Sequence, residues 1–308
     1  MQQMYQKIRN VPTPLGGLAL GIASLGWCLE NAISLHGYGQ MIGALVALCL
    51  IVLLISRFIL PPDTLLNDLR HPVLGSILPT FTMTSMVVSK MIGEYFALMG
   101  SIIWCIAVGL HIMFLATFIY HRARAFSMEH IVPSWFIPPI GLVVAVVTCP
   151  SEEYSGIATV LLMFGLLSYS FLLPTIIYRL IFITQLPDAS KPTIAILAAP
   201  ASLLLVGYLN ITPTPSIFIV AVLLGIAILM TLVVYIALIR LLQLPFSPGF
   251  AAFTFPLVIG ATALYKLSDL TNVYGATIEM SHQLRLLAHG ELLVATLMIA
   301  YVSLSYIR

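Results

Sequence analysis

A succession of apolar stretches, each long enough to cross a lipid bilayer, is the feature that most restricts how this chain can fold. A membrane-spanning helix needs about 20 predominantly apolar residues. Ten such stretches run at approximately residues 12–33, 39–60, 72–89, 96–120, 133–149, 155–182, 192–209, 215–242, 249–267 and 285–307. We therefore expect an all-α integral membrane protein with ten transmembrane helices, forming a single transmembrane domain over residues 1–308.

The composition excludes a water-soluble fold. Hydrophobic residues make up 60% of the chain and charged residues only 8%, whereas soluble domains carry about 25% charged residues. The net charge of +2 is too small and too scattered for binding nucleic acid. Nucleotide-binding, hydrolase and metalloprotease motifs do not occur, and the seven histidines show no short metal-ligand spacing. We expect no enzyme, no cofactor and no metal site.

Lysine and arginine near the helix ends predict the orientation in the membrane, because basic residues resist translocation. Ten of them fall at the end that holds both termini: Lys7, Arg9, Arg57, Arg70, Arg122, Arg124, Arg179, Lys191, Arg240 and Arg308. The opposite end holds Lys90, Lys266 and Arg285. We expect both termini in the cytoplasm and the protein in the bacterial inner (plasma) membrane.

Prolines recur at the start of the odd-numbered helices. Pro14, Pro72, Pro133, Pro192 and Pro248 are separated by 58, 61, 59 and 56 residues. Each interval is the length of one helical hairpin, and every hairpin begins on the same side of the membrane. The pattern predicts five tandem hairpins, at approximately 12–60, 72–120, 133–182, 192–242 and 249–307. A quasi-fivefold ring is the simplest closed arrangement of five such units.

A second set of prolines lies five to eight residues inside the odd-numbered helices. Its members are Pro79, Pro138 with Pro139, Pro200 and Pro256, and Gly21 takes the equivalent place in the first helix. A proline inside a helix frees a carbonyl, which hydrocarbon tolerates only against protein or a water-filled cavity. The pattern therefore predicts kinked odd helices around a central pore and even helices outside. The alternative interpretation is that small residues and prolines serve helix packing alone.

Charged residues are nearly absent from the interior of the predicted helices. Glu291 is the one carboxylate clearly inside an apolar stretch, and its place on an even, outer helix favours a packing or subunit contact over a proton relay. Without a ring of carboxylates there is no basis for a cation filter. Backbone N–H groups, hydroxyls and helix ends can stabilise small anions, although the same features also suit a neutral-solute pore.

Cys28, Cys49, Cys105 and Cys149 form no CxxC pair, so we expect buried free thiols. The sequence leaves open a disulfide between Cys28 and Cys149, because both fall toward the same membrane side.

Three short motifs resemble the tellurite-resistance/dicarboxylate transporter family, which includes bacterial TehA proteins, fungal malate and sulfite transporters and the plant guard-cell slow anion channels. The first is Leu15-Gly16-Gly17-Leu18-Ala19-Leu20-Gly21 with Trp27 near the end of the same helix. The second is His71-Pro72-Val73 at the start of the third helix, and the third is Phe253-Thr254-Phe255-Pro256 in the ninth. The resemblance covers essentially the whole chain through its ten-helix plan.

This resemblance implies a homotrimer in which each subunit has its own pore, lined by five kinked inner helices. It also implies a gate, a phenylalanine on the ninth helix that corresponds by position to Phe255. Phe253 is the competing assignment, but it lies about 200° around a helix from Phe255. The family covers tellurite, dicarboxylates, sulfite and small monovalent anions, and the sequence does not choose among them.

The repeat suggests which residues share the level of the gate. The residues just before the internal prolines, and before Gly21, are Leu20, Leu78, Ile137, Ala199 and Phe255. An apolar collar with one aromatic ring across it would block hydrated ions by steric closure and dewetting. We expect a gated anion channel. The alternatives are a proton-coupled transporter of dicarboxylate, sulfite or tellurite-type oxyanions, and a membrane component that transports nothing.

Overall fold

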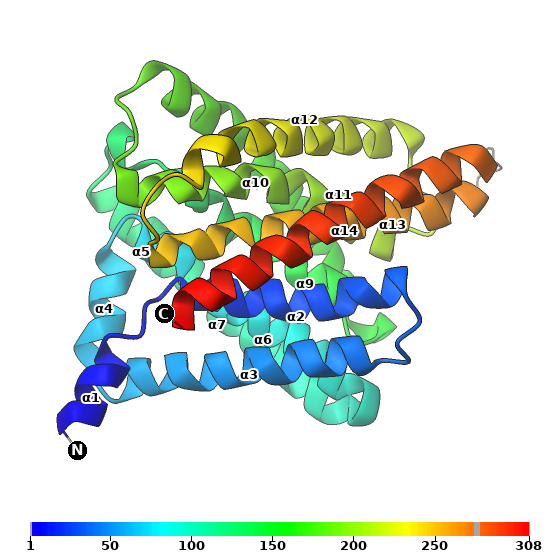
Figure 1. The fold of residues 1–308 in the computed structure, drawn as a ribbon. Helices are drawn as coiled ribbons and strands as arrows, with labels where there is room; N and C mark the ends of the chain where they lie inside the picture. Colours follow the sequence, from blue (N-terminus) through cyan, green and yellow to red (C-terminus); the bar gives the residue numbers. More distant parts are fainter. Residues whose placement is uncertain (1, 274–277, 308) are drawn as a thin grey trace.

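The computed structural model describes residues 2–273 and 278–307, and within these ranges every regular element is helical (Figure 1). Five long helices fall in the even-numbered apolar stretches: α3 (Tyr38–Ile59), α7 (Ala97–Arg124), α10 (Ser155–Phe182), α12 (Ile217–Leu241) and α14 (Ile278–Ile307). The odd-numbered stretches hold α2 (Leu15–Ala32), α5 (Leu74–Ile77) with α6 (Thr80–Tyr95), η2 (Pro133–Phe136) with α8 (Ile137–Ile140) and α9 (Val143–Val147), η4 (Asp188–Ala198) with α11 (Ala199–Ile211), and η5 (Pro248–Phe253) with α13 (Phe255–Val273). We call these two sets the outer helices and the inner segments. The connections hold α1 (Gln2–Arg9), α4 (Pro62–Arg70), η1 (Met128–His130) and η3 (Glu152–Tyr154).

Several of these helices are long and apolar enough to cross a membrane, which makes the chain an integral membrane protein. Among the described residues, seven helices qualify by length and composition: the five outer helices, η4 with α11, and η5 with α13. An eighth is added if α4, α5 and α6 count as one span bent by 101°. The connection between the second and third apolar stretches is itself helical, because α4 forms there.

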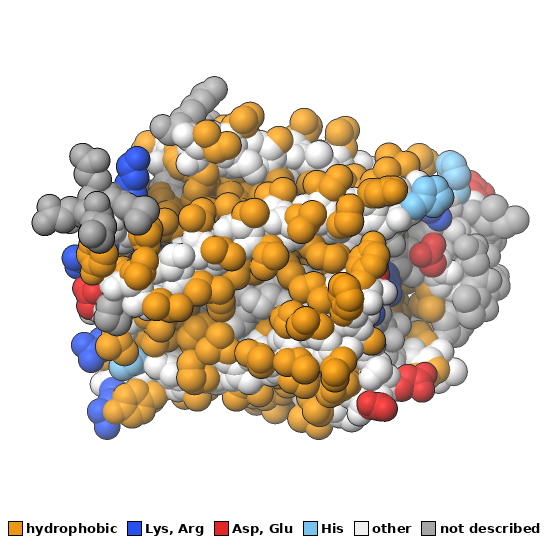
Figure 2. All heavy atoms as spheres, turned by 90° about the horizontal axis from the view of Figure 1, so that it is seen from below, with side chains coloured by type: hydrophobic (Ala, Val, Ile, Leu, Met, Phe, Trp, Pro, Cys, Tyr) orange, Lys and Arg blue, Asp and Glu red, His pale blue; other side chains and the backbone are white. Residues whose placement is uncertain are grey.

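Burial separates the inner segments from the outer helices. In the most apolar part of the spans that contain α11 and α13, 78% of residues are buried, against 28% to 39% in the five outer helices. The exposed side chains of the outer helices are mostly Leu, Ile, Val and Phe, which suits contact with lipid. Figure 2 shows this apolar flank, with charged side chains confined to its two ends.

Each inner segment packs against the outer helix that follows it, and the inner segments also contact one another. α2 contacts α6, α6 contacts α9, α9 contacts α11, α11 contacts α13, and α13 contacts α2 again. Hydroxyl groups bridge some of these contacts. Thr84 donates to Gly16 O at 3.1 Å, Thr254 donates to Gly17 O at 3.1 Å, and the hydroxyls of Ser76 and Ser134 lie 2.6 Å apart.

The internal prolines lie where one helical piece gives way to another. Pro79 precedes the first residue of α6, whereas Pro200 and Pro256 are the second residues of α11 and α13, each following a 3₁₀ segment. Pro138 and Pro139 lie in the four-residue α8. A proline is tolerated in the first turn of a helix because its missing N–H would have no partner there.

Gly21 departs from this pattern, because α2 runs through it without a break. A methyl group at Gly21 would lie 2.5 Å from Cβ of Thr254 and 3.2 Å from the backbone N of Phe255. Gly21 therefore permits the close approach of the start of α13 to α2.

Carbonyl groups freed by the broken inner segments are bound by side chains from neighbouring elements. At the end of α9, Trp104 of α7 donates to Ala145 O at 3.1 Å and Asn210 of α11 donates to Val146 O at 3.1 Å. Unsatisfied carbonyls are costly in a bilayer, so these side chains stabilise the short helix.

Basic residues occupy the last turns of several outer helices at the end where α1 begins and α14 finishes (Figure 1). Arg57 forms a buried ion pair with Asp68 of α4 at 2.6 Å. Thr13 donates to the same carboxylate, also at 2.6 Å. The buried Asp68 carboxylate therefore holds together three segments at this end: α3, α4 and the residues that lead into α2.

We expect Gly26→Val to lower the free energy of unfolding by about 1–3 kcal/mol through overpacking. A methyl group at Gly26 would lie 3.1 Å from the Cα of Gly43, where α2 and α3 cross. Gly109→Val is the matched control, since no atom lies within 4 Å of a methyl group placed there, and we expect a change within about 0.5 kcal/mol. Chemical denaturation in detergent measures both, and equal effects would contradict the close crossing.

Candidate functional site

A cavity of about 60 Å³ lies among the inner segments and is bordered by all five of them. Its wall contains Pro14, Gly17 and Leu20; Ile77, Thr80 and Met83; Phe136, Ile137, Ile140 and Gly141; Ile196, Ala199, Pro200 and Leu203; and Gly249, Ala251, Ala252, Phe255 and Pro256. We call this the proximal cavity, because it lies at the beginnings of the inner segments. Its size matches roughly four to six water molecules, although most of its wall is apolar.

A second, distal cavity of about 30 Å³ follows further along the same segments. On α2, Gly17 and Leu20 border the proximal cavity, and Ser24 and Cys28 border the distal one. On α13, Ile259 and Thr262 lie beside the distal cavity. The two cavities therefore lie in succession along the inner segments.

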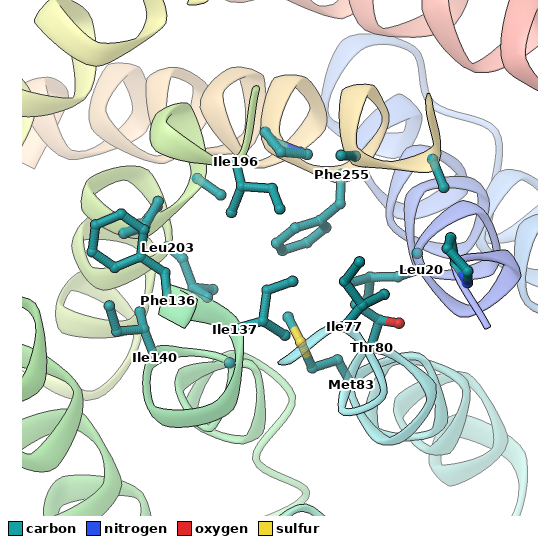
Figure 3. Close-up of a pocket in the computed structure, with 18 of the residues that line it drawn as sticks. Leu20, Ile77, Thr80, Met83, Phe136, Ile137, Ile140, Ile196, Leu203 and Phe255 are labelled. Carbon is teal, nitrogen blue, oxygen red and sulfur yellow. The ribbon is translucent and has the colours of Figure 1, made fainter. Parts of the chain in front are cut away.

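Phe255 and Leu203 are the residues that border both cavities. Figure 3 shows the Phe255 ring projecting from α13 into the space between Leu20, Ile77, Ile137, Ile196 and Leu203. The side chain is only 7% exposed. The Phe255 ring and the Leu203 side chain thus form part of the wall of both cavities.

Local structure explains why Phe255 points inward. It is the first residue of α13, and Thr254 alone separates it from the 3₁₀ segment η5. The hydroxyl of Thr254 lies 2.7 Å from Ala251 O and 3.1 Å from Gly17 O, which ties the turn both to itself and to α2. Gly21 leaves the space in which the Thr254 side chain and the Phe255 backbone lie.

The structure brings together four of the five residues expected at one level. Leu20, Ile137, Ala199 and Phe255 all border the proximal cavity. Leu78 does not: it packs against Leu69 and Phe114, and Ile77 borders the cavity instead. Ile77, Thr80 and Met83 border the cavity at the three-residue spacing of one helical face, and Leu78 lies on another face of this segment.

The other phenylalanine of the motif lies elsewhere. Phe253 is fully buried, and its ring packs against Phe250 with the centroids 4.8 Å apart. It is absent from the walls of both cavities. The expectation that the two rings face different directions agrees with this placement.

The chemistry of the walls differs from the sequence expectation of a pathway rich in hydroxyls. Most hydroxyls of the inner segments bond to backbone carbonyls, as Thr148 does to Val144 O and Thr262 to Val258 O, at 2.8 and 2.9 Å. Apolar side chains consequently dominate the proximal wall. A narrow apolar passage resists ions by excluding their water.

No sequence pattern singles out His111, which lies on α7 and is completely buried against α6 and α8. Its spacing to other histidines carries no signal, and only the fold brings its partners together. Glu291 accepts a hydrogen bond from the Tyr235 hydroxyl of α12 and faces Gly260 of α13. All four cysteines are free, and the described residues contain no cluster of His, Cys, Asp or Glu suited to a metal ion.

Comparison with known proteins yields a family match over nearly the whole chain. The family model described as "SLAC1: Voltage-dependent anion channel" matches residues 14–307. Two proteins of the archaeon Methanocaldococcus jannaschii, the uncharacterized transporters MJ0576 and MJ0762, are each 28% identical to the chain. The alignments cover 69% and 70% of this chain and 70% and 72% of those proteins. The match agrees with the resemblance that the sequence motifs carry.

The position of Cys28 beyond Phe255 allows a test of the separation between the cavities. In a protein whose other cysteines are replaced by alanine, we expect Phe255→Ala to raise the rate at which a small anionic methanethiosulfonate modifies Cys28 by about tenfold or more, because the ring no longer blocks the approach. The reagent is added to sealed vesicles whose outer face carries the chain termini, and mass spectrometry measures the modification. Phe253→Ala is the control, and equal rates in all three proteins would contradict the barrier.

Proposed function

Because the chain belongs to the voltage-dependent anion channel family, we propose that it is a gated anion channel that passes small anions down their electrochemical gradient. One observation carries the proposal: a single aromatic ring, Phe255, borders both of two cavities that follow one another along the inner segments. A ring in this place closes the passage by filling it, and movement of the ring would join the cavities.

The proposed channel consists of ten transmembrane helices in one domain, arranged as five hairpins in a quasi-fivefold ring. The closed series of contacts among the inner segments supports this arrangement, as does the higher burial of α11 and α13. α2 and the η2–α8–α9 segment, which are shorter or broken, complete the count of ten. The subunits form a homotrimer with one pore each, as expected from the family resemblance.

The orientation follows from the distribution of basic residues. Arginines end α3, α7, α10 and α12 at the end of the bundle where both chain termini lie (Figure 1). Basic residues favour the cytoplasmic side, so the termini lie in the cytoplasm and the protein in the plasma membrane. The proximal cavity then faces the cytoplasm and the distal cavity faces outward.

The constriction of the channel is the apolar collar around Phe255. Leu20, Ile137 and Ala199 belong to it as expected, and Ile77 takes the place of Leu78. The cavity walls contain no carboxylate that could attract cations. Buried arginines lie at the cytoplasmic end, where Arg179 is 2% exposed and donates to Thr184 O at 2.6 Å. This excess of positive charge favours anions at the proposed entrance.

A proton-coupled transporter is the second candidate, and Glu291 is the observation in its favour. This carboxylate lies within α14, accepts a hydrogen bond from Tyr235, and leaves Oε1 buried without a partner. Buried carboxylates in membrane helices often take part in proton movement. Glu291 borders neither cavity, however, so the channel remains the better-supported function.

We expect Phe255→Ala to raise chloride and nitrate flux into liposomes by at least about tenfold, the factor produced by removing a barrier of about 1.4 kcal/mol. Phe253→Ala is the matched control: it removes the same side chain two residues away, outside both cavities, and should leave flux unchanged. Phe255→Leu and Phe253→Leu form a second pair of variants, in which the change of side chain is smaller. Unchanged flux from folded Phe255→Ala protein would refute the gate.

Reversal potentials distinguish the two candidate functions. For a channel, the reversal potential of the Phe255→Ala protein should follow the anion gradient and ignore a proton gradient, because only the anion carries current. Glu291→Gln should then leave anion flux unaltered. A reversal potential that moves with the proton gradient, together with loss of flux in Glu291→Gln, would establish coupled transport instead.

A further inference from the structure

His111 joins two broken inner segments from behind the proximal cavity. It lies on α7 and is completely buried. Its Nδ1 lies 2.8 Å from the hydroxyl of Thr82, on α6 just after the break at Pro79, and its Nε2 lies 2.9 Å from the carbonyl of Pro138 in α8. One imidazole therefore contacts the groups beside two of the internal prolines.

The hydrogen-bond partners of His111 suit both the neutral imidazole, which carries one N–H, and the protonated imidazolium, which carries two. A carbonyl only accepts, so Nε2 carries a proton and donates it to Pro138 O. In the neutral ring, Nδ1 accepts from the Thr82 hydroxyl. After uptake of a second proton, Nδ1–H donates to Thr82 Oγ1, and the Thr82 hydroxyl turns to Pro79 O, which lies 2.7 Å away. Every donor keeps an acceptor in both states.

Gly141 lies beside both the imidazole and the proximal cavity. Gly141 borders that cavity, and a methyl group at Gly141 would lie 3.0 Å from Cε1 of His111. Cε1 is the ring carbon between the two nitrogens, so the edge that carries the charge of an imidazolium points at Gly141. A larger side chain at this position would place more atoms between His111 and an anion.

We propose that His111 is a proton-binding site in the wall of the anion pathway, and that its protonation favours an anion in the proximal cavity. The inference rests on the proposed channel function. A positive charge behind Gly141 attracts an anion in this apolar environment, where charges interact more strongly than in water. An anion in the cavity in turn stabilises the protonated ring, because the coupling between two ligands is reciprocal.

Among the described residues, the surroundings of His111 contain no other charge that could take this role. The elements that pack along α7 are α4, α5, α6 and α8, and single side chains of α7 also meet α9, η2 and Tyr154 of η3. The segments α5, α8, α9 and η2 carry no titratable side chain, and η3, which carries Glu152, Glu153 and Tyr154, meets α7 at Trp104, about 10 Å along the helix from His111. On α6 the nearest is Lys90, about 12 Å along the helix from Thr82, followed by Glu94 and Tyr95. On α7 itself the nearest is Cys105, about 9 Å away, before Tyr120, His121, Arg122 and Arg124. α4 carries Asp63, Asp68 and Arg70, and His71 follows it; Asp68 is paired with Arg57.

The test measures flux against pH in the Phe255→Ala protein, in which the ring no longer limits passage. Chloride and nitrate are used because neither changes its charge over this range. We expect flux to rise by about tenfold as the pH falls from about 7.5 to about 4.5, and His111→Gln to abolish that rise while keeping the flux found at the higher pH. A glutamine amide can still donate to Pro138 O but cannot be protonated.

Two further variants keep the proposal open to refutation. Thr82→Val removes the acceptor for Nδ1–H, so the pH at the midpoint of the flux curve should fall by about one unit. This test does not depend on the folding of the His111→Gln protein. His121→Gln, on the same helix, should retain the rise. A histidine that serves packing alone predicts flux independent of pH. That result, or a rise that survives His111→Gln but disappears in His71→Gln, would overturn the proposal.

If Phe255→Ala protein passes no anion at any pH, the proposed channel itself is wrong, and this inference falls with it. If that protein passes anions equally well at every pH, only the role of His111 is wrong.

Discussion

Hydrogen bonding of backbone groups inside a bilayer is the constraint on which the rest of this structure depends. Four of the five inner segments are interrupted at or beside an internal proline, and a broken helix in hydrocarbon needs other partners for its carbonyls. Side chains from surrounding elements provide them. Trp104 and Asn210 bind the last carbonyls of α9, and His111 binds Pro138 O in α8. The outer helices therefore isolate the broken segments from lipid and also help to complete their hydrogen bonding.

The same breaks provide the space for the cavities. Where a 3₁₀ segment passes into an α-helix, side chains change direction, and the five inner segments leave room between them into which the Phe255 ring projects (Figure 3). Most hydroxyls of the inner segments are bonded to backbone carbonyls, either in the same helix or, as with Thr84 on Gly16 and Thr254 on Gly17, in a neighbouring segment. The proposed barrier therefore depends on exclusion of water by apolar side chains, with little contribution from specific ligands.

The five repeats are similar in length and proline position, but they are not equivalent in detail. Gly21 stands where the other repeats have proline, and it allows the start of α13 to approach α2. Leu78 precedes a proline as Phe255 does, yet it faces Leu69 and Phe114. Such differences break the internal symmetry and leave a single aromatic ring between the cavities. A gate formed by one residue is consistent with this asymmetry.

The sequence by itself determined the membrane class and the all-helical fold, because apolar length is a local property that decides whether a segment can cross a bilayer, and its short motifs indicated the family. The family resemblance pointed to Phe255 as the gate, and the rotation between two residues of a helix predicted that Phe253 faces elsewhere. Only the tertiary structure decided that Ile77 replaces Leu78, that Gly21 serves close approach, and that His111 meets Thr82 and Pro138. These contacts join residues far apart along the chain, and their geometry depends on how each broken helix resumes after its proline, which no local pattern specifies.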